Sequence, residues 1–169
     1  MDRCFNRVAV LGLGGVGELA ATLLHAAGFE VLGLDVRPVS LPFPTRAVAA
    51  DNPDGLTQAL GGQEAVLSCL PWQLNAGVAR VAAANSVRYF DLTEDVPTTR
   101  LTRELSQQAG VLMAPQCGLA PGLVGIVGAH LAAQFDVVRS IRLRVGALPQ
   151  HPTGLLGYSF TWSPAGVVN

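Results

Sequence analysis

An α/β fold with a parallel sheet is predicted by three features of this 169-residue sequence. Short apolar runs alternate along most of the chain with longer segments whose apolar residues recur at helical spacing. Turns rich in glycine or proline separate the two kinds of segment. The first apolar run, Val8 to Leu11, passes through a glycine-rich turn directly into a helical segment that extends to about Ala27. Alternation of this kind places helices on the faces of a parallel sheet.

The turn after the first run has the spacing G-x-G-x-x-G, formed by Gly12, Gly14 and Gly17, and a second run, Glu30 to Asp35, ends in a carboxylate. This context is typical of dinucleotide binding. The first glycine permits a tight turn, the second lets a pyrophosphate approach the backbone, and the third lets the helix pack on the strand. The start of the helix favours phosphates. A structural turn that binds nothing is disfavoured, because three glycines cost conformational entropy.

The residues after the second and third strands include the candidates for contact with the adenosine half of the dinucleotide. Asp35 is expected to accept hydrogen bonds from the ribose hydroxyls. Arg37 lies in a proline-broken loop, where it can stack on adenine, hold a 2′-phosphate or simply be solvated. Asp35 would repel a 2′-phosphate, so NAD is favoured over NADP. A third strand is expected over Thr45 to Ala50. Asp51, which follows it, is expected either to cap a helix beginning at Pro53 or to face the adenine. Asn52 can also provide the cap.

The remaining elements complete a doubly wound Rossmann sheet with strand order 3-2-1-4-5-6, because crossovers between parallel strands are right-handed. The fourth strand is uncharged from Ala65 and is expected to be buried on both faces. Asp95 is expected to cap the helix that precedes the sixth strand. The expected elements are the strands 64–71, 88–93 and 110–115 and the helices 72–84, 98–109 and 123–135.

The expected cofactor contacts gather at the carboxyl edge of this sheet, where the ends of the strands meet the glycine turn. They are Gly12, Leu13, Gly14, Gly15, Val16, Gly17, Asp35, Val36, Arg37, Asp51, Cys69, Leu70 and Pro71. No catalytic residue is identified, but Asp91 and Cys117 are candidates on the substrate side. A nearby helix N-terminus can lower the pKa of Cys117. The favoured alternative is a small buried cysteine that fits a tight turn, since free cysteines are usually buried.

Composition excludes several classes of function. The net charge of −1 provides no basic surface for nucleic acid, and no stretch is long and uncharged enough to span a membrane. The three cysteines are widely spaced and form no metal-binding pattern, which favours reduced thiols in a cytoplasmic protein. All 11 basic residues are arginine, so no Schiff base, P-loop lysine or Tyr-x-x-x-Lys dyad of short-chain dehydrogenases can form.

A second domain is indicated by the alternation over Val138 to Val145, in which Ile141, Leu143 and Val145 lie on one face and Arg142 and Arg144 lie on the other. This pattern predicts a half-buried antiparallel strand, unlike the strands before it. We therefore expect a dinucleotide-binding domain over residues 1–136 and the start of an α+β domain over 137–169. The residues that follow the strand are too few to build a sheet around it, so we expect the chain to be incomplete.

Five segments resemble the saccharopine dehydrogenase family, whose relatives include saccharopine reductases, lysine 6-dehydrogenases and carboxynorspermidine synthases. The segments are 10–17, 68–71, 89–93, 117–122 and 146–166, and the last two are the most specific. The resemblance covers essentially the whole chain. It implies an NAD(P)-binding domain followed by a domain for substrate binding and homodimer formation. It also implies hydride transfer between a nicotinamide and the C–N carbon of an amino acid or a related amine or imine.

Two other interpretations stay open. The glycine turn and Asp35 fit a regulatory module that binds NAD(H) without turnover equally well, although such a module has no need of the segments after Cys117. The chain can also be an inactive fragment. We expect the isolated 169 residues to be inactive, because much of a substrate site would lie beyond them.

Overall fold

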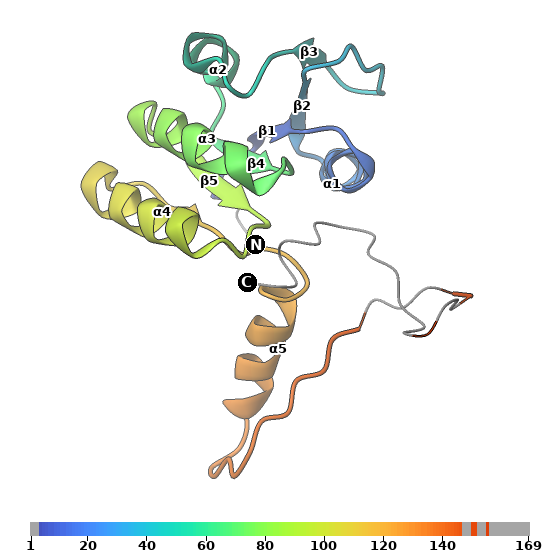
Figure 1. Ribbon diagram of the computed structural model, residues 1–169, viewed down its shortest axis with the longest axis vertical. Coiled ribbons are helices and arrows are strands. Elements are labelled where there is room, and N and C mark those ends of the chain that lie inside the picture. Colours follow the sequence, from blue (N-terminus) through green and yellow to red (C-terminus); the bar gives the residue numbers. More distant parts are fainter. Residues whose placement is uncertain (1–3, 147–149, 152–154, 156–169) are drawn as a thin grey trace. The chain divides into compact units, whose positions relative to one another are not determined.

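The computed structural model describes residues 4–146, 150, 151 and 155, and Figure 1 traces the chain through them. The chain divides into two compact units, Met1–Gly118 and Leu119–Asn169, which are described separately. The expected domain boundary, between residues 136 and 137, lies further along the chain than this division. The expected domain limits therefore stay a prediction.

The first unit is built on a parallel sheet of six strands in the order β3-β2-β1-β4-β5-β6. Every neighbouring pair runs parallel, so the predicted doubly wound order is confirmed. The register places Leu11, the last residue of β1, between Leu34 of β2 and Ser68 of β4, which brings these strand ends together at one edge. The strands are β1 (Arg7–Leu11), β2 (Glu30–Asp35), β3 (Thr45–Ala47), β4 (Ala65–Ser68), β5 (Arg88–Asp91) and β6 (Met113–Ala114).

Four helices of the first unit connect the strands: α1 (Gly15–Ala26), α2 (Pro53–Leu60), α3 (Trp72–Ala84) and α4 (Val96–Ala109). The Asp95 carboxylate accepts a 2.8 Å hydrogen bond from the Thr98 N–H, so the predicted cap of α4 is confirmed. At α2 the capping side chain is Asn52, which accepts a 3.0 Å bond from the Gly55 N–H. Asp51 is thereby free for another role. Within the described residues no helix is long and apolar enough to cross a bilayer.

Both faces of the sheet are covered, which explains why its strands read as continuous apolar runs. On one face Ala9 and Leu11 of β1 pack into a core with α2 and α3, and α3 also packs beside α4. On the other face Val8 and Val10 pack with Ala21 of α1. The alternation along β1 therefore divides two apolar cores between the two layers of helices.

The second unit contains α5 (Leu123–Ala132) and a segment that runs back beside it, residues 137–146 (Figure 1). The predicted strand over residues 138–145 is not formed. A strand needs a neighbour for its backbone N–H and C=O groups, and the described residues of this unit provide none. Instead Leu143 lies so close to Gly128 of α5 that a Cβ there would be 2.9 Å from Leu143 Cδ2. Most of segment 146–166 lies outside the described residues.

Candidate cofactor-binding site

The glycine turn after β1 is pressed against the turn that follows β4. Gly12 has a φ of +91°, a conformation that favours glycine, and its N–H donates a 2.8 Å bond to the Leu34 carbonyl. A Cβ on Gly12 would be 3.0 Å from the Cys69 carbonyl oxygen. On Gly17 it would be 1.8 Å from the Gly12 carbonyl oxygen. Both positions therefore require glycine for space, as the fingerprint predicts.

The N-terminus of α1 has free space around Gly14 and Gly15. A Cβ on Gly14 or Gly15 would meet nothing within 4 Å. Gly14 is the N-cap residue, and no side chain caps the helix. The first backbone N–H groups of a helix have no partner within the helix, and together with the helix dipole they attract an anion. This end of α1 can therefore receive a pyrophosphate.

Asp35 joins the end of β2 to the glycine turn. Its side chain is buried, and Oδ2 accepts a 2.8 Å bond from the Leu13 N–H. Oδ1 accepts bonds from the Arg37 backbone N–H at 2.9 Å and from Arg37 Nε at 3.3 Å. Burial acts to raise the pKa of Asp35, but the bonds from Arg37 and Leu13 outweigh it and hold the pKa below its usual value. The carboxylate is therefore ionised at neutral pH.

A cavity of about 250 Å³ opens beside Asp35. Its walls are mostly apolar, and the carboxylates of Asp35 and Asp51 are its two charged groups. Drug-sized ligand pockets begin at roughly 300 Å³, so this volume suits part of a dinucleotide, such as a nucleoside. The cavity is lined by Leu11, Asp35, Val36, Val48, Ala49, Ala50, Asp51, Leu70 and Leu74.

The structure brings together the sequence-predicted residues Asp35, Val36, Asp51 and Leu70 in this one cavity, and it places Cys69 against the glycine turn. The lining residues Val48, Ala49, Ala50 and Leu74 were not selected from the sequence. Their small or apolar side chains resemble those of any core position, so no sequence signal distinguishes them. Arg37 does not line the cavity; it pairs with Asp35 and leaves 69% of its side chain exposed.

The other half of the edge holds three buried polar residues that were not selected from the sequence, namely Ser68, Asn75 and Tyr89. Ser68, at the end of β4, donates a 2.7 Å bond from Oγ to Asn75 Oδ1 on α3, and both residues are buried. The Tyr89 hydroxyl donates a 2.8 Å bond to Asp91 Oδ2. The available signal was Asn75, a polar residue among the apolar positions of the predicted helix. These bonds satisfy polar groups that would otherwise be costly to bury.

Asp91, a predicted substrate-side candidate, lies at the end of β5 with no exposed surface. Its Oδ1 accepts bonds from the N–H groups of Thr93 at 2.9 Å and Gln116 at 3.2 Å. Burial raises the pKa of Asp91, although the bonds from Tyr89, Thr93 and Gln116 act in the opposite direction. The carboxylate is engaged by its own chain on both oxygens.

Cys117, the other candidate, is exposed, so the expectation of a buried cysteine is wrong. Its thiol donates a 3.3 Å bond to the Ala114 carbonyl. Partial burial and the charge of Asp91 raise the pKa of Cys117, the opposite of the lowering considered from the sequence. The next helix along the chain begins at Leu123, six residues after Cys117. The charge that acts on the thiol is that of the Asp91 carboxylate, which disfavours the thiolate. Cys117 is therefore a neutral thiol at pH 7.

The turn after β4 also holds a neutral thiol, since burial raises the pKa of Cys69 to about 11. The Cys69 N–H donates a 2.8 Å bond to the Leu11 carbonyl, which fixes this turn beside the end of β1. Pro71 follows as the N-cap residue of α3. Cys69 can thus contribute backbone groups and bulk at this edge, but no thiolate.

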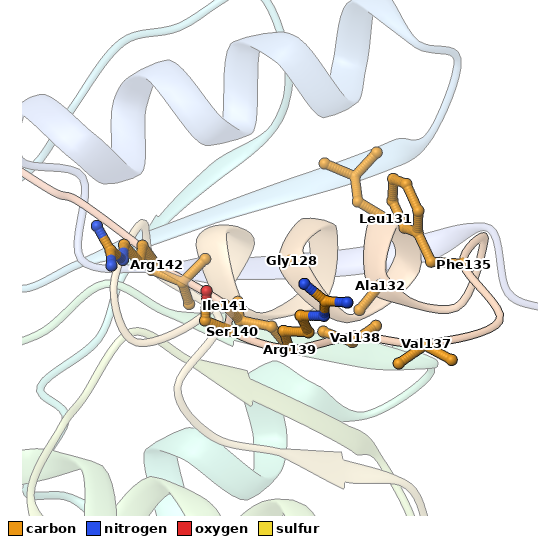
Figure 2. Close-up of a pocket in the computed structure, with 11 residues that line it drawn as sticks. Gly128, Leu131, Ala132, Phe135, Val137, Val138, Arg139, Ser140, Ile141 and Arg142 are labelled. Carbon is orange, nitrogen blue, oxygen red and sulfur yellow. The ribbon is translucent and has the colours of Figure 1, made fainter.

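A larger, open groove of about 700 Å³ lies within the second unit, between α5 and the segment 137–143 (Figure 2). Its lining is mainly apolar, with Leu131 and Phe135 on one side and Val137 and Val138 on the other. Arg139 and Arg142 provide its charged groups. The groove has no acid, cysteine or histidine in its lining, and it contains none of the predicted site residues.

Comparison with known proteins gives relatives in sequence, although no family model matches the chain. The chain is 27% identical over 178 residues to the α-aminoadipic semialdehyde synthase, mitochondrial, of Rattus norvegicus. It is 26% identical over 189 residues to the protein of the same name from Bos taurus. Each match covers 96% of this chain but 19% of the relative. The chain thus spans about a fifth of the length of these curated relatives.

Solved structures share the fold. An apo saccharopine dehydrogenase (L-Glu forming) from Saccharomyces cerevisiae has a TM-score of 0.64 and 20% identity, covering 96% of this chain and 40% of that one. A GalE-like L-threonine dehydrogenase from Cupriavidus necator has a TM-score of 0.57 and 15% identity, covering 64% of this chain and 53% of that one. Over 96% of its length the chain is thus similar in fold to a saccharopine dehydrogenase, which confirms the resemblance to the saccharopine dehydrogenase family that its motifs predicted.

Proposed function

We propose that this chain is the dinucleotide-binding part of an NAD(P)-dependent oxidoreductase of the saccharopine dehydrogenase type. The observation that carries the proposal is the joint placement of the glycine turn, the open start of α1 and the Asp35 carboxylate at one edge of a parallel sheet. Relatives named for α-aminoadipic semialdehyde synthesis and for an L-Glu-forming reaction support an amino acid or a related amine or imine as the substrate.

The residues present fit an adenine dinucleotide. The adenosine would occupy the cavity beside Asp35 and Asp51, with its ribose hydroxyls donating to the Asp35 carboxylate. The pyrophosphate would lie at the N–H groups that begin α1, beside Gly14. When bound, the cofactor supplies or accepts the hydride at the C–N bond of the substrate. The protein positions the two reactants and excludes water around them.

NAD is favoured over NADP by the charges of the cavity. Asp35 is ionised, and Asp51 adds a second carboxylate to the lining. A 2′-phosphate on the adenosine ribose would face both negative charges. Arg37 could offset this repulsion only by leaving its 3.3 Å pairing with Asp35. The net balance therefore disfavours the phosphorylated cofactor.

The role of Asp35 is tested by the substitution Asp35→Asn, with NAD⁺ affinity measured by isothermal titration calorimetry. An amide loses the charge and directs an NH₂ group at a backbone N–H. We expect NAD⁺ to bind about 10- to 100-fold more weakly, as for lost hydrogen bonds to a charged group. Glu30→Gln is the matched control, because Glu30 is an exposed acid at the opposite end of the same strand. Equal affinities of both variants for NAD⁺ would contradict the proposal.

Further features of the complete protein belong to this proposal. We expect the isolated chain to bind cofactor without oxidising or reducing an amine, because it spans only 40% of the saccharopine dehydrogenase chain to which it is similar. Steady turnover of NADH or NAD⁺ by the 169 residues with any amino acid would contradict that expectation.

A homodimer and a cytoplasmic location are also proposed. The free thiols Cys4, Cys69 and Cys117 suit a reducing compartment.

A further inference from the structure

We infer that Asp91 is a positioning residue, which acts through the loop after β6 to fix the edge of the sheet that receives the nicotinamide half of the cofactor. This inference rests on the proposed function and assigns Asp91 a role other than contact with substrate. It stands on three observations: the place of Asp91 in the sheet, the bonds of its carboxylate and the backbone conformation of Gln116.

The sheet order locates the nicotinamide half. The cavity beside Asp35 lies at the ends of β2 and β3, and the glycine turn lies at the end of β1. A dinucleotide crosses a doubly wound sheet at the point where the strand order reverses, here between β1 and β4. Its second half therefore extends over the ends of β4 and β5. Asp91 is the last residue of β5 and pairs in register with Ser68, the last residue of β4.

The Asp91 carboxylate ties two loops together at this edge. Oδ1 accepts from the Thr93 N–H at 2.9 Å, in the loop after β5, and from the Gln116 N–H at 3.2 Å, in the loop after β6. The main-chain carbonyl of Asp91 accepts a further 2.7 Å bond from the Cys117 N–H. One residue thereby holds two successive backbone positions of the second loop.

The second loop needs this support. Gln116 has a φ of +63°, in the left-handed region that side chains other than glycine rarely adopt. Such a conformation is strained and persists only where its surroundings enforce it. The Gln116 side chain contributes little, because its amide is 3.5 Å from Thr99 Oγ1 on α4. The carboxylate of Asp91 is the buried charged group that receives the Gln116 N–H.

Asp91 itself is out of reach of a ligand. It has no exposed surface, and its second oxygen, Oδ2, accepts the 2.8 Å bond from the Tyr89 hydroxyl. Cys117 is the exposed neighbour of Gln116, so the surface that a cofactor can meet belongs to the loop. Loss of Asp91 would therefore act on the nicotinamide half through displacement of this loop and leave the distant adenosine cavity unchanged.

The test compares two ligands that differ only at this half, NAD⁺ and ADP-ribose, by calorimetry on the 169-residue chain. In Asp91→Ala we expect NAD⁺ affinity to fall about tenfold or more, as for loss of a bond to a charged acceptor, with ADP-ribose affinity within about twofold. Asp91→Asn should restore NAD⁺ affinity. Its carbonyl can accept from Thr93 and Gln116 while its NH₂ donates to the Tyr89 oxygen.

Tyr89→Phe is the control for stability alone. It leaves Asp91 Oδ2 without its 2.8 Å bond and should lower the melting temperature, yet it keeps the bond to Gln116 and should not change the ratio of the two affinities. If Asp91→Ala does not fold, Asp91→Ala combined with Gln116→Gly should fold and should show a smaller loss of NAD⁺ affinity relative to ADP-ribose than Asp91→Ala is expected to show, and an undiminished loss would count against the inference. Glycine adopts the left-handed conformation without the cost that Gln116 bears.

Three results would overturn the inference. The first is an equal loss of NAD⁺ and ADP-ribose affinity in Asp91→Ala, which would indicate a purely structural role. The second is a loss in Asp91→Asn as large as in Asp91→Ala, which would indicate that the charge itself acts on the ligand. The third is equal affinity of the unaltered chain for both ligands. Failure of the unaltered chain to bind either ligand would instead contradict the proposed function.

Discussion

At the scale of single residues, two aspartates at the same sheet edge have opposite environments. The Asp35 carboxylate accepts bonds from Leu13 and Arg37, which hold its pKa below the usual value. Asp91 is more deeply buried, and burial raises its pKa despite the bonds that it accepts. The first is charged beside a cavity and suited to binding a ligand. The second is enclosed and suited to fixing the backbone around it.

The raised pKa of Asp91 has a consequence for stability. Between its unfolded value, about 3.8, and its higher folded value, the native state binds more protons than the unfolded state. The free energy of unfolding therefore falls as pH rises through this window. Asp91→Asn removes the titration, so its stability relative to the unaltered chain should increase with pH from about pH 4 upward. Urea unfolding at several pH values measures this difference, and a difference that decreases with pH would contradict the raised pKa.

Gly17 is the residue at which space is most restricted. A Cβ there would overlap the Gly12 carbonyl oxygen, at 1.8 Å, so Gly17→Ala must displace α1 from the turn. We expect a loss of about 1–3 kcal/mol in the free energy of unfolding, as for an overpacked core, together with weaker NAD⁺ binding. Thermal unfolding and calorimetry measure the two effects.

Gly77→Ala is the matched control for this substitution. Gly77 lies within α3, and a Cβ there would meet nothing within 4 Å. Alanine is about 1 kcal/mol better than glycine in a helix, so this variant should be more stable than the unaltered chain and should bind NAD⁺ equally. If both alanine variants were equally stable, the close contact at Gly17 would not control the packing of α1.

At the scale of elements, capping fixes where the helices begin. Asp95→Ala removes the 2.8 Å bond to the Thr98 N–H at the start of α4. We expect the free energy of unfolding to fall by about 1 kcal/mol, the typical cost of losing such a cap. Glu94→Ala, a change in the adjacent exposed acid, should cost less. Chemical denaturation measures both, and equal losses would show that the Asp95 side chain is not the cap.

Elements with local signals were predictable from the sequence. Uncharged apolar runs marked the buried strands, the glycine spacing marked the turn, and Asp95 with Pro97 marked the start of α4. The strand over 138–145 was predicted wrongly, since alternation specifies a face but cannot provide the neighbour that a strand requires. The pKa of Cys117 was also beyond prediction, because it depends on Asp91, which is distant in sequence.

The residues that line the cavity beside Asp35 were also only partly predictable from the sequence. Asp35 and Asp51 were selected from their positions at strand ends, and both line it. The apolar residues Val48 and Leu74 were not selected, because only the packing of α3 beside the sheet makes them part of a site. The binding roles of all these residues stay predictions.

At the scale of the whole molecule, the first unit contains every residue expected to contact the cofactor, from Gly12 to Pro71. The glycine turn and the Asp35 carboxylate lie together at one edge of the six-stranded sheet, which is the arrangement that a dinucleotide site requires. We therefore expect these 169 residues to bind a dinucleotide without any partner.

The most direct test is a parallel calorimetric titration of the chain with NAD⁺ and NADP⁺. The charges of Asp35 and Asp51 predict that NAD⁺ binds about tenfold more tightly, a difference of about 1.4 kcal/mol. A preference for NADP⁺ would contradict the selection of NAD and would transfer the decisive role to Arg37. Absence of binding by both, from a chain shown to be folded by its thermal unfolding, would contradict the central claim that this sheet edge is a dinucleotide site.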